Sequence, residues 1–501
     1  MRTFRDVVDE QARRAPSAPF LIAPEPQATL TYEALRRSAR SFAAQLDALG
    51  VPPRSIVGFM LPNGGAAACI FLSAMYGGQI VMPINLVAQD AHLDHVLRHA
   101  APAIIFVAPD FEARLRAAIE RTGAQSIVQV VPADGVEAGA HRECDELTPI
   151  EPSSPAMLMY TSGTTGMPKG VLLSHANMIC AGEAVASAQS LTGDDRVLSS
   201  LPLYHINGQC IATIAPLVSG GSIVMPHRFS VSQWWGWVER YRPTWLNVVP
   251  TIIAYLLHGP ELTPEQRNAC GGIRFVRSAS APLPPHQHRD FEARFGLAVL
   301  EALGLTECAS VAFANPLDST KRKIGSVGIP LAVEARIMLD GAVRTDGTPG
   351  EIQVRGPNVM LGYFRAPAET AKAIDASGWL ATGDLGYRDA DGFYFVTGRL
   401  KELIIKGGEN IAPREIDEAL LRHPAVLEGA AVGIPDEEYG QEIFACVVLK
   451  PDHVLTESEL RLHCERELGR FKTPKLLRFV AELPKGPSGK VQRLKLGELL
   501  S

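Results

Sequence analysis

Short apolar runs alternate with amphipathic segments through most of this sequence, and that alternation limits the fold more than any other feature. Residues 33–49 place apolar side chains four and three residues apart, between Thr31, a suitable N-terminal cap, and Gly50, a suitable terminator. Uncharged runs with the length of buried strands lie at 56–61, 103–107, 127–131 and 156–160. Helices that alternate with buried strands are typical of α/β layers built on parallel sheets.

The pattern changes from about Gly347 onward. Polar and apolar residues alternate at 351–354 and 392–396, with Gly and Asp between them, which predicts antiparallel strands or a small barrel. The last part of the chain has a different order, which predicts a separate small α+β domain. Its expected elements are helix 413–421, strands 430–434 and 443–449, helix 457–468 and strand 476–480.

Composition excludes several classes of protein. The chain has 501 residues, of which 46% are hydrophobic, enough for more than one domain core. The net charge is −6 and there is no basic block, so we expect no nucleic-acid partner. No uncharged apolar run reaches the roughly 18 residues of a membrane span, and the amphipathic start does not resemble a signal peptide. The eight cysteines form no CxxC pair, so we expect neither zinc nor disulfides but a reduced, cytoplasmic protein.

A loop rich in Gly, Ser and Thr follows the strand-like run that ends at Tyr160. Its glycines let backbone N–H groups surround an anion, and Lys169 adds a positive charge. It is not a Walker A loop, because two residues rather than four separate Gly163 from Gly166. A plain surface turn is the alternative, but the whole string favours phosphate binding. The predicted phosphate-binding residues are Thr161, Ser162, Gly163, Thr164, Thr165, Gly166 and Lys169.

The string 161–170 resembles the signature of the adenylate-forming, or AMP-binding, superfamily of acyl-CoA synthetases, luciferases and peptide-synthetase adenylation domains. Further elements follow in that family's order, so the resemblance covers nearly the whole chain. They are Leu201-Pro202-Leu203-Tyr204-His205, Leu303-Gly304-Leu305-Thr306-Glu307, Thr382-Gly383-Asp384, Gly398-Arg399-Leu400-Lys401-Glu402 and Pro487-Ser488-Gly489-Lys490-Val491. The resemblance implies an ATP-dependent acid–CoA ligase. In that reaction a carboxylate attacks ATP to give an acyl-adenylate and pyrophosphate, and coenzyme A then takes the acyl group and releases AMP.

The resemblance and the change of pattern together imply a division into two domains. We expect an N-terminal adenylation domain, residues 1–400, with α/β layers, parallel sheets and a small β-barrel-like part. A small mobile α+β domain, residues 401–501, would follow. Lys401 matches the family's hinge position, and rotation about it would exchange Lys490 for a thiol tunnel in one cleft.

Two sites in the C-terminal part follow from the resemblance. Lys490 would touch both the attacking carboxylate and the α-phosphate of ATP, so that it neutralises charge as they meet; a solvated lysine is the alternative. Gly407 and Gly408 would admit the pantetheine arm of coenzyme A, and a structural turn is the competing interpretation.

The nucleotide contacts are also implied by the resemblance. Glu307 would bind Mg²⁺, because this hard cation takes carboxylate and phosphate oxygens together. Thr306 would donate to the α-phosphate. Asp384 would accept hydrogen bonds from both ribose hydroxyls, and Arg399 would support the ribose or the phosphates. Leu303 stands where relatives usually have an aromatic residue, so it would cover the adenine without stacking.

The identity of the acid is less constrained. His205 is a positioning or gating ring in relatives, and Asn207 and Gln209 place amides where ligases for aryl or fatty acids tend to be apolar. This favours a short or polar acid, such as a small dicarboxylate or a sulfonated acid. The residues expected to line the acyl pocket are His205, Asn207, Ser280, Ala281 and Gly304.

Several alternatives remain from the sequence. An aryl- or fatty-acid–CoA ligase is one, and an enzyme that loads a carrier-protein thiol is another. A third is an AMP- or ATP-binding regulator without catalysis, although such a protein needs neither Lys490 nor Glu307. The cluster of Trp234, Trp235, Trp237 and Trp245 is explained by core packing better than by a hydrophobic tunnel. The oligomeric state stays open, a homodimer included.

Overall fold

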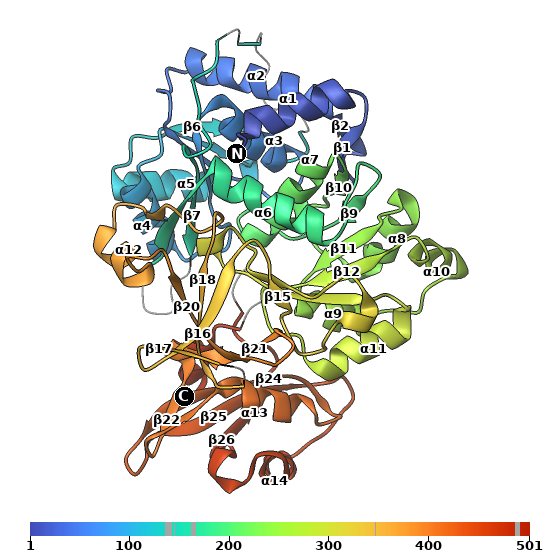
Figure 1. The fold of residues 1–501 in the computed structure, drawn as a ribbon, viewed down its shortest axis with the longest axis vertical. Coiled ribbons are helices and arrows are strands. Elements are labelled where there is room, and N and C mark those ends of the chain that lie inside the picture. The colour runs from blue at the N-terminus through green and yellow to red at the C-terminus, as the bar shows by residue number, and fades with distance from the viewer. Residues whose placement is uncertain (136–142, 145, 162–166, 346, 486–490, 501) are drawn as a thin grey trace.

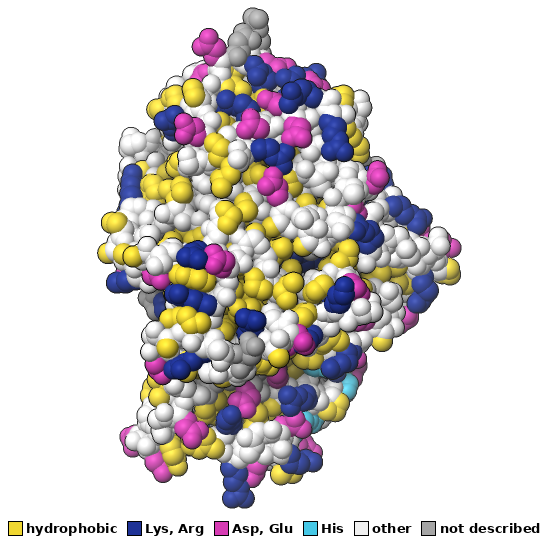
Figure 2. All heavy atoms as spheres, in the orientation of Figure 1, with side chains coloured by type: hydrophobic (Ala, Val, Ile, Leu, Met, Phe, Trp, Pro, Cys, Tyr) yellow, Lys and Arg dark blue, Asp and Glu magenta, His cyan; other side chains and the backbone are white. Residues whose placement is uncertain are grey.

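The computed structural model describes residues 1–135, 143–144, 146–161, 167–345, 347–485 and 491–500. The molecule is elongated, with the N-terminal part at one end and the C-terminal part at the other (Figure 1). Lys and Arg side chains are interspersed with Asp and Glu over the face in Figure 2, which agrees with a net charge of only −6. No helix among the described residues is both long and apolar enough to cross a membrane.

The larger of two mixed sheets has nine strands in the order β15-β14-β13-β12-β11-β9-β10-β1-β2. The six strands from β13 to β1 are parallel to one another. At the edges, β14 pairs antiparallel with β13 and β15, and β2 pairs antiparallel with β1. The strands are β1 (Pro19–Ala23), β2 (Ala28–Thr31), β9 (Arg196–Leu198), β10 (Ser222–Val224), β11 (Trp245–Val248), β12 (Phe275–Ser278), β13 (Val299–Leu303), β14 (Phe313–Ala314) and β15 (Ile329–Pro330).

The second mixed sheet has seven strands in the order β19-β8-β7-β4-β3-β5-β6. The strands from β7 to β6 are parallel, and β8 and β19 add an antiparallel edge. Its strands are β3 (Ile56–Met60), β4 (Ile80–Pro83), β5 (Ile104–Val107), β6 (Ile127–Val130), β7 (Pro155–Thr161), β8 (Lys169–Ser174) and β19 (Gly362–Tyr363). The four strand-like runs of the sequence therefore all lie in one sheet, where β3, β5 and β6 are adjacent and β4 separates β7 from β3.

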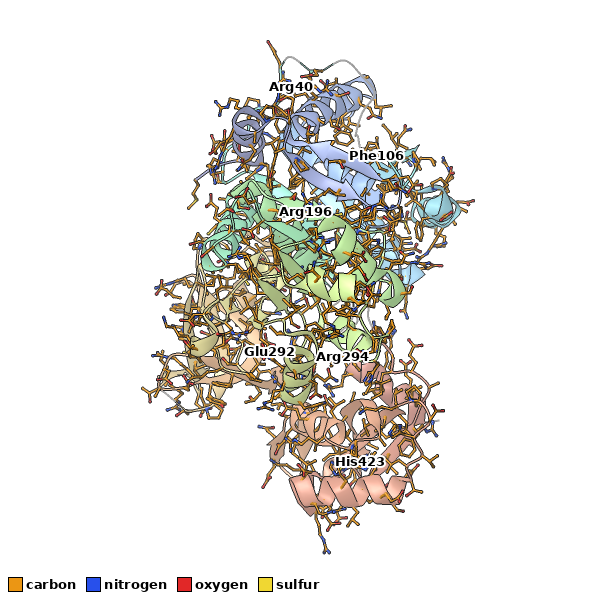
Figure 3. The ribbon with its side chains drawn as sticks, turned by 90° about the vertical axis from the view of Figure 1, so that its right-hand side faces the viewer. Arg40, Phe106, Arg196, Glu292, Arg294 and His423 are labelled. Carbon is orange, nitrogen blue, oxygen red and sulfur yellow. The ribbon has the colours of Figure 1, made fainter. Side chains whose placement is uncertain are left out.

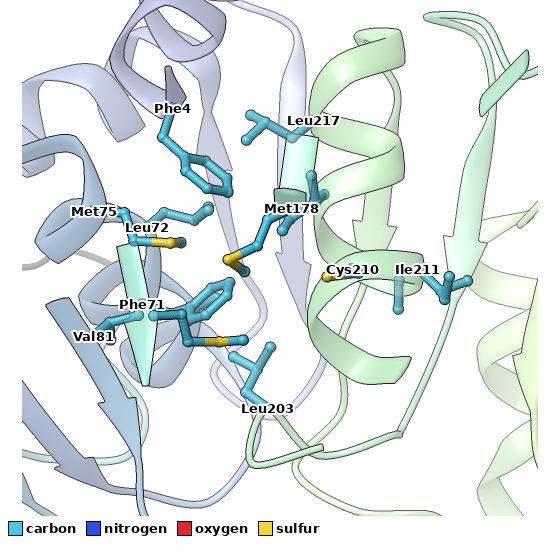
Figure 4. Packing of buried hydrophobic residues seen from close by; sticks show 14 of the residues in the cluster. Phe4, Phe71, Leu72, Met75, Val81, Met178, Leu203, Cys210, Ile211 and Leu217 are labelled. Carbon is cyan, nitrogen blue, oxygen red and sulfur yellow. The ribbon is translucent and has the colours of Figure 1, made fainter. Parts of the chain in front are cut away.

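Helices cover both sheets and fill the space between them. In the core, Phe4 of α1, Phe71 and Leu72 of α3, and Met178 of α6 pack together (Figure 4). Every residue of α3 is buried, which explains why this helix is apolar on all sides. The helices are α1 (Phe4–Arg14), α2 (Tyr32–Ala48), α3 (Gly65–Gly77), α4 (Asp90–Ala100), α5 (Pro109–Thr122), α6 (His175–Ala188), the π-helix η1 (Asn207–Ile214), α7 (Ala215–Ser219), α8 (Val231–Tyr241), α9 (Pro250–Leu257), α10 (Pro264–Cys270) and α11 (Pro285–Phe295).

An antiparallel sheet connects this body to the end of the chain. Its order is β17-β16-β18-β20-β21, with β17 and β21 at the two edges. The short helices η2 (Thr306–Cys308) and η3 (Ser319–Lys321) come before it in the chain, and α12 (Pro367–Ala373) lies between β19 and β20. The strands are β16 (Glu334–Leu339), β17 (Ala342–Arg344), β18 (Gly350–Arg355), β20 (Leu380–Arg388) and β21 (Tyr394–Arg399).

We call residues 404–500 the C-terminal unit. It forms a lobe below α11, marked in Figure 3 by His423, while Glu292 and Arg294 mark α11. The short helix η4 (Leu400–Glu402) leads into it from β21. Its elements are β22 (Ile404–Lys406), β23 (Glu409–Ile411), α13 (Pro413–Leu421), β24 (Val426–Asp436), β25 (Gly440–Leu449), α14 (Glu457–Leu468), η5 (Arg470–Lys472), β26 (Leu476–Phe479) and η6 (Arg493–Leu500).

These elements confirm the expected fold class of α/β layers with parallel sheets, followed by antiparallel strands and a small α+β part. The helix expected at 33–49 is α2, and the Thr31 hydroxyl accepts the backbone N–H of Ala34 at its start. The four tryptophans of the cluster are all buried, with at most 9% exposed surface, which confirms that they pack in the core. Sequence patterns did not reveal the π-helix or the β22–β23 hairpin.

His175 is a buried titratable group in this fold. It opens α6, and its Nδ1 accepts the backbone N–H of Phe4 at 3.3 Å. That nitrogen must therefore be unprotonated. Burial lowers the pKa of His175 to about 4, and a positive charge would also be unfavourable at the N-terminus of a helix.

Replacing His175 by Gln should weaken the loss of stability in acid. An unfolded histidine binds a proton near pH 6.5, so between that value and the folded pKa of about 4 the unfolded state holds more protons. Stability then falls as the pH falls, by about 2 kcal/mol for this group between pH 7.5 and pH 5. Urea unfolding of wild type and variant at both pH values measures the difference. An equal loss in the two proteins would contradict the assignment.

Candidate active site

Two paired strands frame the predicted phosphate loop. β7 ends at Thr161 and β8 begins at Lys169, and these two residues are opposite each other in the antiparallel pair. The Thr161 hydroxyl donates to the carbonyl of Lys169 at 3.4 Å. The intervening predicted residues, Ser162, Gly163, Thr164, Thr165 and Gly166, lie outside the described part of the chain.

The ammonium of Lys169 is held by a carboxylate. Its Nζ lies 2.5 Å from Oε2 of Glu369 at the start of α12 and 5.0 Å from the centre of the Tyr363 ring. Lys372 pairs with the same carboxylate at 2.8 Å. The hydrogen bond from Lys169, followed by that from Lys372, lowers the pKa of Glu369 to about 2. A phosphate at this loop would compete with Glu369 for Lys169.

Tyr363 links the phosphate loop to the predicted magnesium ligand. Glu307 is half-buried in η2, directly after β13, and its Oε1 accepts the Tyr363 hydroxyl at 3.0 Å. Burial raises the pKa of Tyr363, so the phenol remains a donor at neutral pH. The carbonyl of Glu307 accepts the backbone N–H of Met360 at 2.8 Å. Thr306, also half-buried, precedes Glu307 in the same turn.

Asp384 and Arg399 are opposite each other on β20 and β21. Nε of Arg399 lies 2.7 Å from Oδ1 of Asp384, whose side chain is only 3% exposed. This carboxylate raises the pKa of Arg399, and Glu307 contributes to the same shift. The structure therefore brings Lys169, Glu307, Asp384 and Arg399 into one neighbourhood, as the sequence predicted.

A second cluster of polar side chains lies at the start of the π-helix η1. Local π-helical segments are often found at functional sites. The Asn207 amide donates to the Ser280 hydroxyl at 3.1 Å and accepts from the Asn247 amide at 3.0 Å. Ser280 has φ of +75°, a conformation that favours glycine. His205 lies two residues before Asn207, just ahead of η1, and is half-buried.

Gly304, predicted for the acyl pocket, and the nearby Gln209 have local structural contacts. A Cβ added at Gly304 would lie 1.3 Å from the carbonyl oxygen of Ser310, so only glycine fits there. Gln209 is fully buried and donates to the carbonyl of Leu203. Leu303 on β13 and Ala281 after Ser280 are both half-buried.

The predicted hinge and coenzyme A residues lie at the start of the C-terminal unit. Lys401 is exposed in η4. Gly407 and Gly408 form the turn of the β22–β23 hairpin with φ of +57° and +83°, as a tight hairpin turn requires. The two glycines therefore form a turn, and binding of coenzyme A there stays a prediction. Lys490 lies outside the described residues.

Some residues of the site carried no recognisable motif. Tyr363, Glu369 and Asn247 were missed because each meets its partner only through the tertiary fold. Arg277 did carry a signal, since a charged residue follows the apolar pair Phe275-Val276 within a strand.

Comparisons with known proteins identify the family to which the chain belongs. A family model described as AMP-binding enzyme matches residues 8–364, and one described as AMP-binding enzyme C-terminal domain matches residues 415–490. The chain is 51% identical over 499 residues to a sulfoacetate–CoA ligase of Cupriavidus necator, covering 99% of this chain and 97% of that one. It is 34% identical over 460 residues to an oxalate–CoA ligase of Arabidopsis thaliana, covering 89% and 88% of the two chains.

Solved structures show the same architecture. Crystalline ATP-bound MatB from Rhodopseudomonas palustris superimposes with a TM-score of 0.91 at 30% identity, covering 99% of both chains. The apo form of that MatB gives 0.78 at 29% identity with the same coverage.

The chain belongs to the family of AMP-binding enzymes. It is an acid–CoA ligase of the AMP-forming type, so the family and enzyme class expected from the motifs are confirmed.

Replacing Glu369 by Gln should lower the KM for ATP by a factor of about two to five, because an exposed ion pair that competes for Lys169 is weakened. Initial rates at saturating acid and coenzyme A measure this. Glu33→Gln is the matched control, since it disrupts an exposed pair with Arg36 at 2.7 Å on α2. An unchanged or higher KM in the Glu369 variant would show that this pair does not oppose nucleotide binding.

Proposed function

We propose that this enzyme activates a short acid with a second anionic group, sulfoacetate being the first candidate, and transfers its acyl group to coenzyme A. The observation that carries the proposal is the 51% identity to a sulfoacetate–CoA ligase over nearly the whole of both chains. The polar group of Asn207, Asn247 and Ser280 supports it, because a fatty or aryl acid would leave these buried amides without a function.

The described residues have complementary tasks in adenylation. Lys169 and the loop it ends would hold the β- and γ-phosphates, and Asp384 would accept the ribose hydroxyls with Arg399 beside it. Thr306 would donate to the α-phosphate. Glu307 suits Mg²⁺, because its carboxylate accepts one hydrogen bond from Tyr363 and retains a second oxygen for a hard cation. The cation would reduce the repulsion between the phosphates and the attacking carboxylate.

The second half-reaction requires movement of the C-terminal unit. We keep the division into residues 1–400 and 401–501 with a hinge at Lys401 as part of the proposal. Two observations support it: the C-terminal unit has apolar clusters of its own, and the two forms of MatB match this chain with different TM-scores. Gly407 and Gly408 would then border the passage of the pantetheine arm.

The cellular setting is a further part of the proposal. All eight cysteines are free, and ATP and coenzyme A are supplied in the cytoplasm, so we place the enzyme there. A homodimer stays a prediction for size-exclusion chromatography to test.

A pyrophosphate-release assay over a panel of acids tests the proposed function. We expect release with sulfoacetate, malonate or oxalate and little with benzoate or palmitate, together with a CoA thioester as product. Release without any thioester would indicate a carrier-protein thiol as the acceptor. Absence of release with every acid would overturn the proposal in favour of a nucleotide-binding regulator.

Replacing Lys490 by Ala should slow adenylation by on the order of 100-fold or more, because the charge that neutralises the meeting anions is lost. Thiolysis of supplied acyl-adenylate by coenzyme A should continue at close to the wild-type rate. Lys472→Ala is the control, a surface lysine of the same unit that pairs with Glu415 at 2.8 Å. Equal loss of both half-reactions would refute the role of Lys490.

A further inference from the structure

Arg277 on β12 is a buried cation without a partner in the part of the chain that the structure describes. Its exposed surface is 1%, and none of Nε, Nη1 and Nη2 has a hydrogen-bond partner. Among the described residues no carboxylate oxygen accepts a hydrogen bond from it. Buried arginines are normally paired on several sides, because an isolated charge away from water is costly.

The charge persists despite its surroundings. Burial lowers the pKa of Arg277 to about 10, which still leaves the guanidinium protonated at neutral pH. Such an arrangement costs stability in the folded protein. When local contacts do not offset such a loss of folding stability, the residue often belongs to a functional site.

The sheet register places Arg277 beside the predicted acyl pocket. It is opposite Asn247 on β11 and Leu300 on β13, so these three side chains point to the same face of the sheet. Asn247 donates on that face to Asn207, which in turn holds Ser280. Arg277 also lies one residue before the carboxyl end of β12, and ligands of parallel α/β sheets bind at carboxyl ends.

The acidic side chain on the neighbouring strand is directed elsewhere. Glu301 is opposite Ser278, one residue further along, and therefore lies on the other face of the sheet. There it accepts hydrogen bonds from Gly325 and pairs with His288 at 3.0 Å. Among the described residues, therefore, no carboxylate is bonded to Arg277.

We infer that Arg277 binds the second anionic group of the acid, a sulfonate or a carboxylate, while the reacting carboxylate faces ATP. This inference rests on the proposed function and names the residue that selects the substrate class. A guanidinium offers a planar fork of N–H donors that fits two oxygens of either group. A monocarboxylic acid would leave the buried charge unpaired, so the pocket rejects it.

Kinetics of Arg277→Gln and Arg277→Lys test the inference. With sulfoacetate, we expect the KM of the Gln variant to rise on the order of 100-fold, because one partner of a buried charge pair is removed. The KM for ATP should change by less than about threefold. The KM of the Lys variant for sulfoacetate should lie between those of wild type and the Gln variant. Lysine retains the positive charge but lacks the planar set of N–H donors. Arg267→Gln, at an exposed arginine on α10, is the control for loss of a positive charge.

An isostere that lacks only the second negative charge makes the test specific for that charge. Methylsulfonylacetate has nearly the shape of sulfoacetate without the second negative charge. Wild type should strongly prefer sulfoacetate, and Arg277→Gln should lose most of that preference. Parallel assays with malonate show whether a carboxylate serves as well as a sulfonate at this position.

Thermal unfolding separates binding from a merely structural role. Without substrate, Arg277→Gln should melt at the same or a higher temperature than wild type, because an unpaired buried charge is removed. A structural arginine would instead leave the variant less stable.

The outcomes separate the two proposals. If wild type releases no pyrophosphate with any acid, the proposed function fails. If wild type activates sulfoacetate but Arg277→Gln retains its KM and its preference for sulfoacetate, the proposed function stands and the inference is overturned. An equal rise in the KM for ATP would also overturn it, by placing the guanidinium at the nucleotide.

Discussion

The location of the candidate site depends on one constraint: the parallel strands are buried on both faces of their sheet. Strands covered by helices must be apolar along most of their length, so polar side chains gather at or near the carboxyl ends. β11 and β12 follow this rule: Trp245 and Phe275 pack in the core, whereas Asn247 and Arg277, two residues further on, begin the polar region. The position of the acyl side of the site follows from this constraint.

The nucleotide side depends on antiparallel additions to the same framework. β8 extends the second sheet beyond β7 and carries Lys169 at its start, while β19 pairs with β8 and carries Tyr363. Through Tyr363, the end of the phosphate loop is connected to Glu307, which follows a strand of the other sheet. Packing of the two sheets around the shared core thereby determines the relative positions of the residues predicted to bind phosphate and magnesium.

Much of this arrangement could be predicted, because local patterns determine local elements. Helix 413–421 and helix 457–468 were predicted with the bounds that α13 and α14 have, since Pro413 and the Thr456 cap mark their starts. The motif residues Asp384 and Arg399 were predicted to contact the same nucleotide, and in the structure they form an ion pair. Tyr363 and Glu369 could not be found this way, because their roles arise from contacts between distant segments. The absence of a partner for Arg277 is likewise a property of the folded chain alone.

We infer that the buried guanidinium of Arg277 determines which acid this ligase activates. A crystal structure of the enzyme with AMP and sulfoacetate tests it most directly. We expect sulfonate oxygens within about 3 Å of the terminal nitrogens of Arg277, with the carboxylate directed toward the α-phosphate. A sulfonate bound away from Arg277, with the guanidinium still without an anionic partner, would contradict it.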